Sequence, residues 1–222
     1  MSTAGILLRA VSGFRRKDDV TRPRRARVSW ASINGCPGAG QSIAWEGMAT
    51  RHLTRSVIGM KRVPPAEGQE SVWDYPRPPR VETTSEHVVV RLGGIVVAET
   101  REAVRVLETS HPPVYYLPVA SFAPGALEPA PGRSYCEFKG AAAYLTVRGA
   151  AGAVAEGAGW IYPEPAHGYE ALRDRVALYL GRMDSCSVDG EAVQPQPGDF
   201  YGGWITSRVV GPFKGAPGTM GW

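Results

Sequence analysis

The side chains best suited to chemistry lie in three short blocks of the sequence, at residues 108–118, 136–144 and 159–165. Glu108 and His111 lie in the first block, and Cys136 and Lys139 lie in the second. A histidine can transfer protons near neutral pH, a cysteine thiolate is a nucleophile, and a lysine ammonium binds anions. These four residues are therefore the candidate catalytic set, with Glu108 either paired with Lys139 or orienting His111.

Cys136 has two interpretations. As a nucleophile it would need a nearby base or cation to lower its thiol pKa from about 8.5, and His111 is the histidine in these blocks that could serve. The alternative is a structural role, because free cysteines are often buried as small apolar residues. In a strand over residues 135–139, Cys136 and Phe138 would face one side and Lys139 the other.

Lys139 also has two interpretations. It precedes Gly140, so its ammonium could bind an anion beside a backbone that a ligand can approach. The alternative is an exposed, solvated lysine.

Five aromatic residues in or beside the same blocks could form the walls of a cleft or the core of a small β domain. Buried Tyr and Trp side chains need hydrogen-bond partners, and these blocks carry more polar capacity than a small core normally holds. We therefore expect a binding cleft, with the aromatic residues Tyr115, Tyr116, Tyr144, Trp160 and Tyr162 as its candidate binding residues.

Two classes of function remain open from these residues. One is a small-molecule enzyme, in which Lys139 binds a polar or anionic metabolite and His111 or Cys136 performs acid–base or nucleophilic work. The other is a non-catalytic domain that binds a ligand or a protein in the same cleft. Replacing the reactive residue of an enzyme abolishes turnover while ligand affinity is kept. A binding domain has no turnover, so the same replacement can change only its affinity.

The positive charge of the chain belongs to its first part. Residues 1–59 contain ten Lys and Arg against three Asp and Glu, and residues 60–222 contain fifteen against eighteen. The folded part is thus mildly acidic, and no nucleic-acid partner is expected for it. No run approaches the ~20 apolar residues of a membrane helix, so no membrane partner is expected. Nothing in the sequence indicates an oligomeric state.

Residues 1–59 are interpreted as a disordered or over-called basic leader, and residues 60–222 as a single domain. A basic arm that touches phosphates is the alternative for the Arg-rich run at 15–27. The same segment contains GCPGAGQS at 35–42, which is similar to a Walker A loop, but Gln41 stands where the phosphate-binding lysine is needed. We therefore expect no nucleotide site there.

The cysteines and histidines lack metal-ligand spacing. Cys36, Cys136 and Cys186 are widely separated, no C-x-x-C pair occurs, and no two histidines lie four residues apart. We expect no metal, no cofactor, no disulfide framework and a cytoplasmic location, and a melting temperature that excess chelator leaves unchanged.

The pattern from residue 81 onward predicts short strands and tight turns. Hairpins are expected at 88–98, at 143–160 and around 188–191, because Gly-Gly, Gly-rich and Asp-Gly turns separate apolar alternating runs. The segment 100–108 is expected to be a strand rather than a helix. We expect the first two hairpins to pair in one antiparallel sheet.

One surface helix is predicted at 165–179, because Tyr169, Leu172, Val176 and Tyr179 fall on one stripe at helical spacing. Residues 185–222 contain eight Gly and four Pro, too many for regular structure. This Gly/Pro-rich wrap should run over the body as loops, anchored by the aromatic residues Phe200, Tyr201, Trp204, Phe213 and Trp222. Lys214 is assigned to a chain reversal.

The three blocks read ETSHPPVYYLP at 108–118, CEFKGAAAY at 136–144 and GWIYPEP at 159–165. They resemble the domain-of-unknown-function family 427. The flanks at 70–81 and 200–204 are similar to those of longer bacterial members, so the resemblance extends over about residues 62–222.

The resemblance implies a mainly β, β-rich α+β fold, similar to the compact antiparallel β-tent of the Mss-four-like superfamily. Many members of that superfamily hold zinc between two C-x-x-C pairs, which this sequence lacks. A nucleotidyltransferase activity is sometimes attached to the family, but its Gly-Ser and paired-aspartate pattern is absent here. The resemblance therefore implies a fold and leaves the chemistry open.

Overall fold

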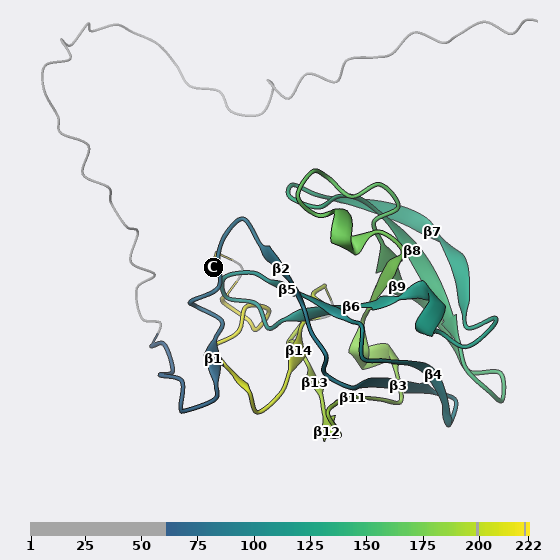
Figure 1. Ribbon diagram of the computed structural model, residues 1–222, viewed down its shortest axis with the longest axis horizontal. Helices are drawn as coiled ribbons and strands as arrows, with labels where there is room; N and C mark the ends of the chain where they lie inside the picture. The colour runs from purple at the N-terminus through teal and green to yellow at the C-terminus, as the bar shows by residue number, and fades with distance from the viewer. Residues whose placement is uncertain (1–60, 199, 220) are drawn as a thin grey trace, which may run out of the picture. The chain divides into compact units, whose positions relative to one another are not determined.

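The computed structural model describes residues 61–198, 200–219, 221 and 222. These residues fold into mainly antiparallel β-sheets, and they contain three 3-10 turns and no α-helix (Figure 1). The prediction of a mainly β protein is confirmed. The leader at 1–59, with its Walker-like loop, Cys36 and His52, lies outside the described residues.

The largest unit is a seven-stranded antiparallel sheet of order β2-β5-β6-β10-β9-β8-β7. The preference for a strand at 100–108 is confirmed by β5. The strands of this sheet are β2 (Arg80–Thr83), β5 (Val104–Leu107), β6 (Val114–Pro118), β7 (Leu127–Cys136), β8 (Gly140–Arg148), β9 (Val154–Ile161) and β10 (Arg175–Leu178).

A second sheet of four strands has the order β12-β11-β3-β4, and two strand pairs, β1-β15 and β13-β14, complete the structure. The four-stranded sheet consists of β3 (Val88–Leu92), β4 (Ile95–Thr100), β11 (Ser185–Val188) and β12 (Glu191–Ala192). The remaining elements are β1 (Glu70–Ser71), β13 (Gln194–Pro195), β14 (Trp204–Ile205), β15 (Val209–Val210) and the 3-10 turns η1 (Val119–Ser121), η2 (Glu170–Leu172) and η3 (Leu180–Arg182).

All three predicted hairpins form. Gly93 and Gly94 both have positive φ, 63° and 77°, as the tight turn between β3 and β4 requires. Asp189 and Gly190 do the same between β11 and β12, with φ of 48° and 83°. The β8–β9 hairpin turns through 149–153, where the Gly149 N–H donates to the Ala153 carbonyl.

The first two hairpins do not share a sheet, so that prediction is wrong. The β3–β4 hairpin pairs with β11, whereas the β8–β9 hairpin pairs with β7 and β10. The turn of one hairpin contacts the turn of the other, but no strand of one pairs with a strand of the other. A Cβ added at Gly149 would lie 2.2 Å from the Leu92 carbonyl oxygen, and one at Gly93 would lie 2.3 Å from that of Ala150. Hydrophobic alternation identifies each hairpin, but it does not specify which neighbour each hairpin pairs with.

The predicted helix at 165–179 is also wrong. Only Glu170–Leu172 forms a single 3-10 turn, and Arg175–Leu178 is the strand β10, paired with β6 and β9. Asp174 has a φ of 56°, which ends any right-handed helical path before the strand begins. Residues 176–178 are consecutively buried because the strand carries protein on both faces.

Replacing Leu172 with alanine should cost about 2–5 kcal/mol of unfolding free energy. Leu172 is 0% exposed in the described structure, so truncation leaves a cavity although the residue is not helical. Urea unfolding of the two proteins measures the difference. Arg173→Ala is the exposed control and should stay within about half a kcal/mol of the wild type. If Leu172→Ala also stays within about half a kcal/mol of the wild type, the side chain of Leu172 is not packed as described.

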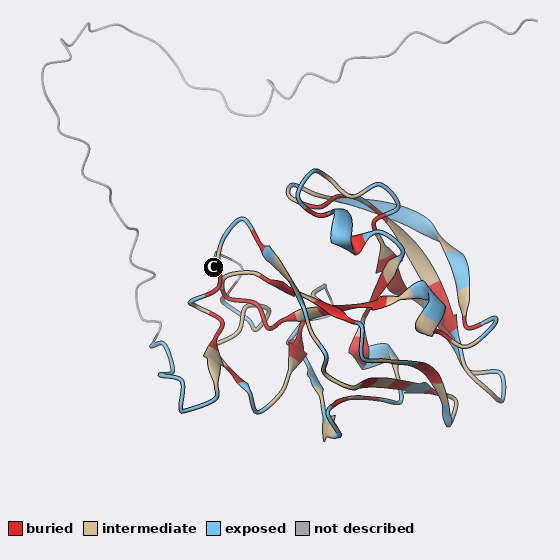
Figure 2. Ribbon diagram, viewed as in Figure 1, coloured by how far each residue is buried: buried red, intermediate tan, exposed pale blue. Residues whose placement is uncertain are grey.

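The two faces of the seven-stranded sheet are both covered. Buried residues follow its central strands, whereas β7 at one edge is mostly exposed (Figure 2). Successive side chains on a strand point to opposite faces. Val176 and Leu178 therefore join the core shared with the four-stranded sheet, while Ala177 between them joins a second cluster around Tyr116 and Trp160.

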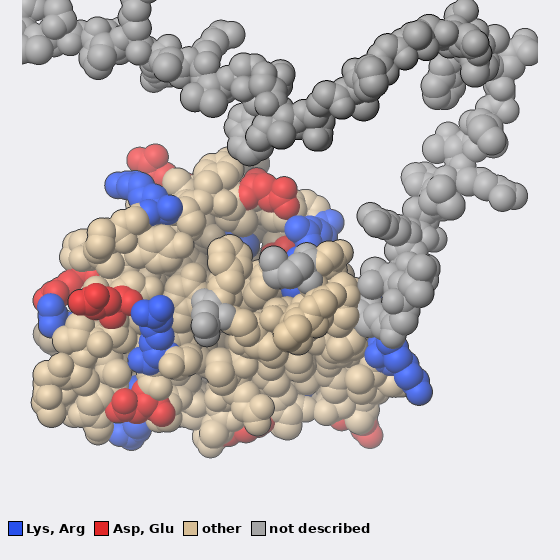
Figure 3. Space-filling model, turned by 180° about the vertical axis from the view of Figure 1, so that it is seen from behind, with Lys and Arg blue, Asp and Glu red and all other residues tan. Residues whose placement is uncertain are grey.

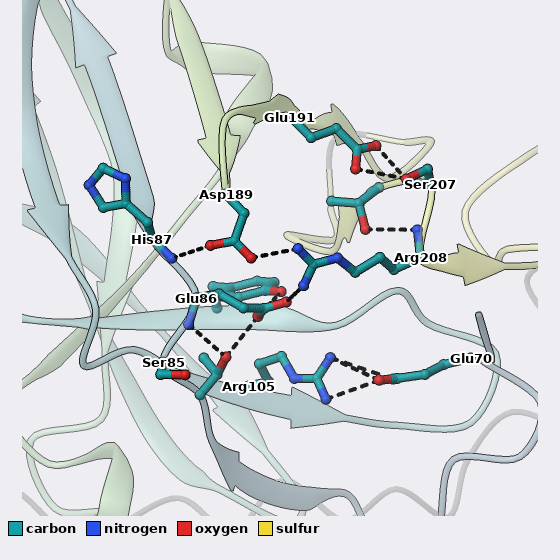
Figure 4. Close-up of polar contacts among 12 residues, drawn as sticks. Glu70, Ser85, Glu86, His87, Arg105, Asp189, Glu191, Ser207 and Arg208 are labelled. Carbon is teal, nitrogen blue, oxygen red and sulfur yellow. Dashed lines mark hydrogen bonds and ion pairs between the residues drawn. The ribbon is translucent and has the colours of Figure 1, made fainter. Parts of the chain in front are cut away.

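The C-terminal segment is more regular than its Gly and Pro content predicts, because 185–222 contains the strands β11 to β15. Arg208 joins it to the rest of the domain through an ion pair with Glu86, and a second ion pair, with Asp189, lies within the segment itself (Figure 4). Of the predicted anchors, Trp204 is completely buried. Phe200 is 78% exposed, so it does not anchor the segment in the core, and that part of the prediction is wrong.

Candidate functional site

A row of side chains crosses one face of the seven-stranded sheet. Ala177 on β10 is in register with Tyr116 on β6 and with Trp160 on β9, and Trp160 is in register with Tyr144 on β8. Residues directly opposite one another share a face, so Tyr116 and Trp160 flank the small Ala177, and Tyr144 lies beyond Trp160 in the same row. The indole N–H of Trp160 donates to the Tyr116 hydroxyl over 3.2 Å.

Two more tyrosines extend this aromatic face. The Tyr162 ring lies 6.3 Å from that of Tyr116, and the Tyr179 ring lies 4.6 Å from that of Trp160. Burial raises the pKa of Tyr116 and of Tyr162 well above the ordinary value, and burial together with Tyr144 raises that of Tyr179 to about 12. These hydroxyls are therefore protonated at neutral pH and can donate hydrogen bonds to a ligand.

Tyr115 lies on the opposite side of the sheet from this site. Its ring joins the core between the two sheets, 5.0 Å from the ring of Trp204, and its hydroxyl donates to Glu86. Because Tyr115 and Tyr116 are adjacent on β6, only one of them can face the site. The structure therefore separates Tyr115 from the other predicted site residues.

Charged side chains border the aromatic face. Lys139 Nζ lies 3.9 Å from Glu108 Oε2, and Arg77 contacts Glu108 at 3.5 Å and Glu137 at 3.3 Å. Lys139 has an 11% exposed side chain and Glu108 an 18% exposed one, so both charges are largely shielded from water. The pairing of Glu108 with Lys139 is one of the two arrangements that the sequence left open.

Lys139 sits in a turn rather than in a strand. β7 ends at Cys136 and β8 begins at Gly140, so residues 137–139 form the connection. The expected alternation of side chains along 135–139 therefore fails beyond Cys136. The Lys139 carbonyl accepts from Ala166 N–H, which holds the turn against the chain that follows β9.

His111 is held in one tautomer. Its Nδ1 lies 3.0 Å from the Thr109 carbonyl oxygen, which can only accept, so Nδ1 carries the proton and Nε2 presents a lone pair. Burial lowers the pKa of His111, opposed by Glu108 and assisted by Lys214 and Arg77. The neutral imidazole can therefore act as a base or a hydrogen-bond acceptor.

Cys136 packs against the aromatic face. It is partly buried against the cluster that contains Tyr116 and Tyr162. Among the described residues, no hydrogen bond joins Cys136 to His111. Cys136 and Cys186 are both free thiols.

One cavity of about 510 Å³ unites most of these groups. Its volume lies within the usual range of small-molecule sites. Eight of the nine predicted site residues line it, with Tyr115 as the exception: Glu108, His111, Tyr116, Cys136, Lys139, Tyr144, Trp160 and Tyr162.

Sequence reasoning missed other residues that line the cavity. Arg77 and Phe138 are joined by a cation–π contact of 5.6 Å, and the ring of Tyr201 lies 5.0 Å from that of His111. Lys214 also lines the cavity, although the sequence assigned it to a chain reversal. In the sequence, Lys214 stands between Phe213 and Gly215, and this setting gave no signal that its side chain reaches the cavity.

In the described part of the chain, no group of three or more His, Cys, Asp or Glu side chains has a geometry suited to a metal ion. No helix in that part is long and apolar enough to cross a membrane.

We expect the free energy of unfolding to depend on pH because His111 is buried in its neutral form. Its pKa is lowered in the native protein and near 6.5 when unfolded, so the unfolded chain binds more protons between these two pKa values. Unfolding free energy should therefore fall as the pH drops below about 6.5, and His111→Gln should show a smaller fall.

Urea midpoints between about pH 7.5 and about pH 5 measure this difference. His167→Gln, at a fully exposed position, is the control and should keep the wild-type pH dependence. Identical slopes for His111→Gln and the wild type would show that His111 is not held neutral.

Comparison with known proteins identifies the domain that carries most of this site. No curated protein matches the chain. A protein-family profile described as "Domain of unknown function (DUF427)" matches residues 80–189, which include β2 to β11 and the turn that carries Lys139. The resemblance found in the sequence blocks is thereby confirmed over this narrower range. Residues 80–189 are a DUF427 domain.

Proposed function

We propose that the cavity binds a small anionic molecule with an aromatic ring. The observation that carries this proposal is the burial of Lys139 and of a neutral His111 beside one carboxylate, Glu108, in a cavity walled by aromatic side chains. An apolar pocket with a few convergent polar groups is the usual form of a small-molecule site. The lysine favours an anion, and the aromatic walls favour a ring.

We further propose that the domain is an enzyme that uses His111 as its acid–base group. The lone pair on Nε2 can accept a proton from a bound substrate, and Glu108 lies close enough to stabilise the resulting imidazolium. Lys139 would bind the anionic group of the substrate. This assigns proton transfer to His111 and leaves Cys136 as a packing residue of the aromatic face.

A non-catalytic ligand-binding domain is the second candidate. It is favoured by the absence, among the described residues, of a hydrogen bond between the nucleophile candidate Cys136 and a base. Under this alternative the same residues hold the ligand and no bond is broken. Turnover that is lost in His111→Gln while ligand affinity is kept would distinguish the enzyme from the binder.

The finer fold class and the setting of the protein are part of the same proposal. The antiparallel sheets support assignment to the β-tent architecture of the Mss-four-like superfamily. Free thiols at Cys136 and Cys186 support a cytoplasmic location, and the resemblance of the flanks to longer bacterial members supports a bacterial source. On the face shown in Figure 3 basic and acidic side chains are interspersed, which supports a small-molecule partner rather than a nucleic acid.

Phenyl phosphate, which joins an aromatic ring to an anion, tests the proposal. It should bind the full chain and change the tryptophan fluorescence, because Trp160 lines the cavity. Trp160→Phe should lose most of this change, whereas Trp73→Phe, altered outside the cavity lining, should keep it. No binding to the wild type, or an undiminished change in Trp160→Phe, would contradict the proposed site.

A further inference from the structure

The cavity extends beyond the DUF427 domain. The family profile covers residues 80–189, yet the lining also includes Arg77 before it and Gln196, Tyr201 and Lys214 after it. We propose that residues 200–214, held in place by Gln196, supply the anion-binding end of the cavity, with Lys214 as a second cation that contacts the ligand's phosphate or carboxylate group together with Lys139. This inference rests on the proposed function and assigns a specificity-determining role to a segment outside the matched domain.

Hydrogen bonds fix this segment in place. The buried Gln196 side chain donates from Nε2 to the Lys214 carbonyl over 2.7 Å and accepts at Oε1 from Gly203 N–H over 3.1 Å. The Lys214 N–H donates in turn to the Ser110 carbonyl over 2.9 Å. Lys214 is therefore attached directly to the residue that precedes His111.

The segment also lies directly against the aromatic face. A Cβ added at Gly202 would lie 2.2 Å from the Cη2 atom of Trp160, so only glycine allows this approach. The neighbouring Tyr201 ring meets the His111 ring edge-on at 5.0 Å. The segment is thus packed against two of the residues on which the proposed function depends.

The charges of the cavity distinguish Lys214 from the other cations. Lys139 faces Glu108, and Arg77 faces Glu108 and Glu137. Among the described residues, no carboxylate side chain lies within ion-pair distance of Lys214, whose Nζ donates over 2.6 Å to a main-chain oxygen of Trp222, the last residue of the sequence. An entering phosphate or carboxylate group can take the place of that oxygen as the acceptor of this hydrogen bond.

The position of Lys214 also fits a ligand that spans the cavity. Lys214 Nζ lies 5.9 Å from the centre of the Tyr201 ring, and Tyr201 contacts His111. An anionic group held by Lys214 would therefore direct the attached ring toward Trp160 and Tyr116. The ligand class that this arrangement favours is an aromatic ring carrying a phosphate or a carboxylate.

Binding of phenyl phosphate and of benzoate to the full chain, measured by calorimetry, tests the inference. Lys214→Met keeps an unbranched chain without the charge and should weaken binding of the preferred probe about tenfold or more. Lys214→Arg keeps the charge and should bind more tightly than Lys214→Met. The matched control Lys61→Met, at an exposed position, should bind as the wild type does.

The NMR titration of His111 gives a second readout that needs no ligand. Because Lys214 disfavours the protonated imidazole, Lys214→Met should raise the pKa of His111, and Lys61→Met should not. Unchanged probe affinity in Lys214→Met, together with weakened binding in Lys139→Met, would overturn this inference and leave the proposed function standing. Failure of both probes to bind the wild type would overturn the proposed function itself, and the inference with it.

Discussion

Replacing Lys139 with methionine should weaken phenyl phosphate binding by about a hundredfold. Lys139 is the most shielded of the lysines that line the cavity, with an 11% exposed side chain, so little water competes for its charge. Removing the ammonium also leaves Glu108 facing an entering anion with one fewer positive neighbour. Both effects act against the ligand, and calorimetry on the wild type and Lys139→Met measures their sum.

The fold should survive this substitution. Arg77 remains 3.5 Å from Glu108, so the carboxylate keeps one cationic partner, and methionine preserves the unbranched chain of lysine. The melting temperature should therefore change little, and Lys139→Arg should recover part of the affinity. Wild-type affinity in a folded Lys139→Met protein would show that the ligand does not contact this lysine.

The local elements with strong turn chemistry were predictable from the sequence. The pairs Gly93–Gly94 and Asp189–Gly190 take the positive φ angles that a two-residue hairpin turn demands, and few other residues take them without strain. The pairing of those hairpins was not predictable. It depends on contacts such as that of Gly149 with Leu92, which are far apart in sequence.

The false helix shows why apolar spacing alone is ambiguous. Tyr169, Leu172 and Val176 are all buried, as the helical stripe predicted, but they are buried by a turn followed by a central strand. A strand that is covered on both faces has a continuous run of apolar residues in its sequence, and residues 176–178 form such a run. The positive φ of Asp174 is the local event that separates the two elements.

The candidate site was partly predictable because its residues lie in three polar-aromatic blocks. Adjacent residues on one strand face opposite ways, which placed Tyr116 in the cavity and Tyr115 in the core. Which of the two would face the site depended on the sheet's orientation, which the sequence did not reveal. Tyr201 and Lys214 reach the cavity only through tertiary packing of the C-terminal segment.

Replacing Trp204 with alanine should cost about 3–5 kcal/mol of unfolding free energy, a large share of the total stability of a typical domain. The side chain is 0% exposed and packs against Tyr115, and the main-chain N–H of Trp204 donates to the Pro113 carbonyl. Urea unfolding measures the loss. Phe200→Ala, four residues earlier and 78% exposed, is the control and should lose less than about half a kcal/mol.

Trp204→Phe separates packing from hydrogen bonding at the same position. The indole Nε1 of Trp204 is buried and has no hydrogen-bond partner among the described residues, so tryptophan carries a desolvation cost that phenylalanine lacks. Phenylalanine loses some volume but removes that cost, and Trp204→Phe should therefore be clearly more stable than Trp204→Ala. If both variants are as stable as the wild type, the packing of Trp204 does not stabilise the core of the domain. In that case this packing also does not hold Tyr201 and Lys214 at the cavity.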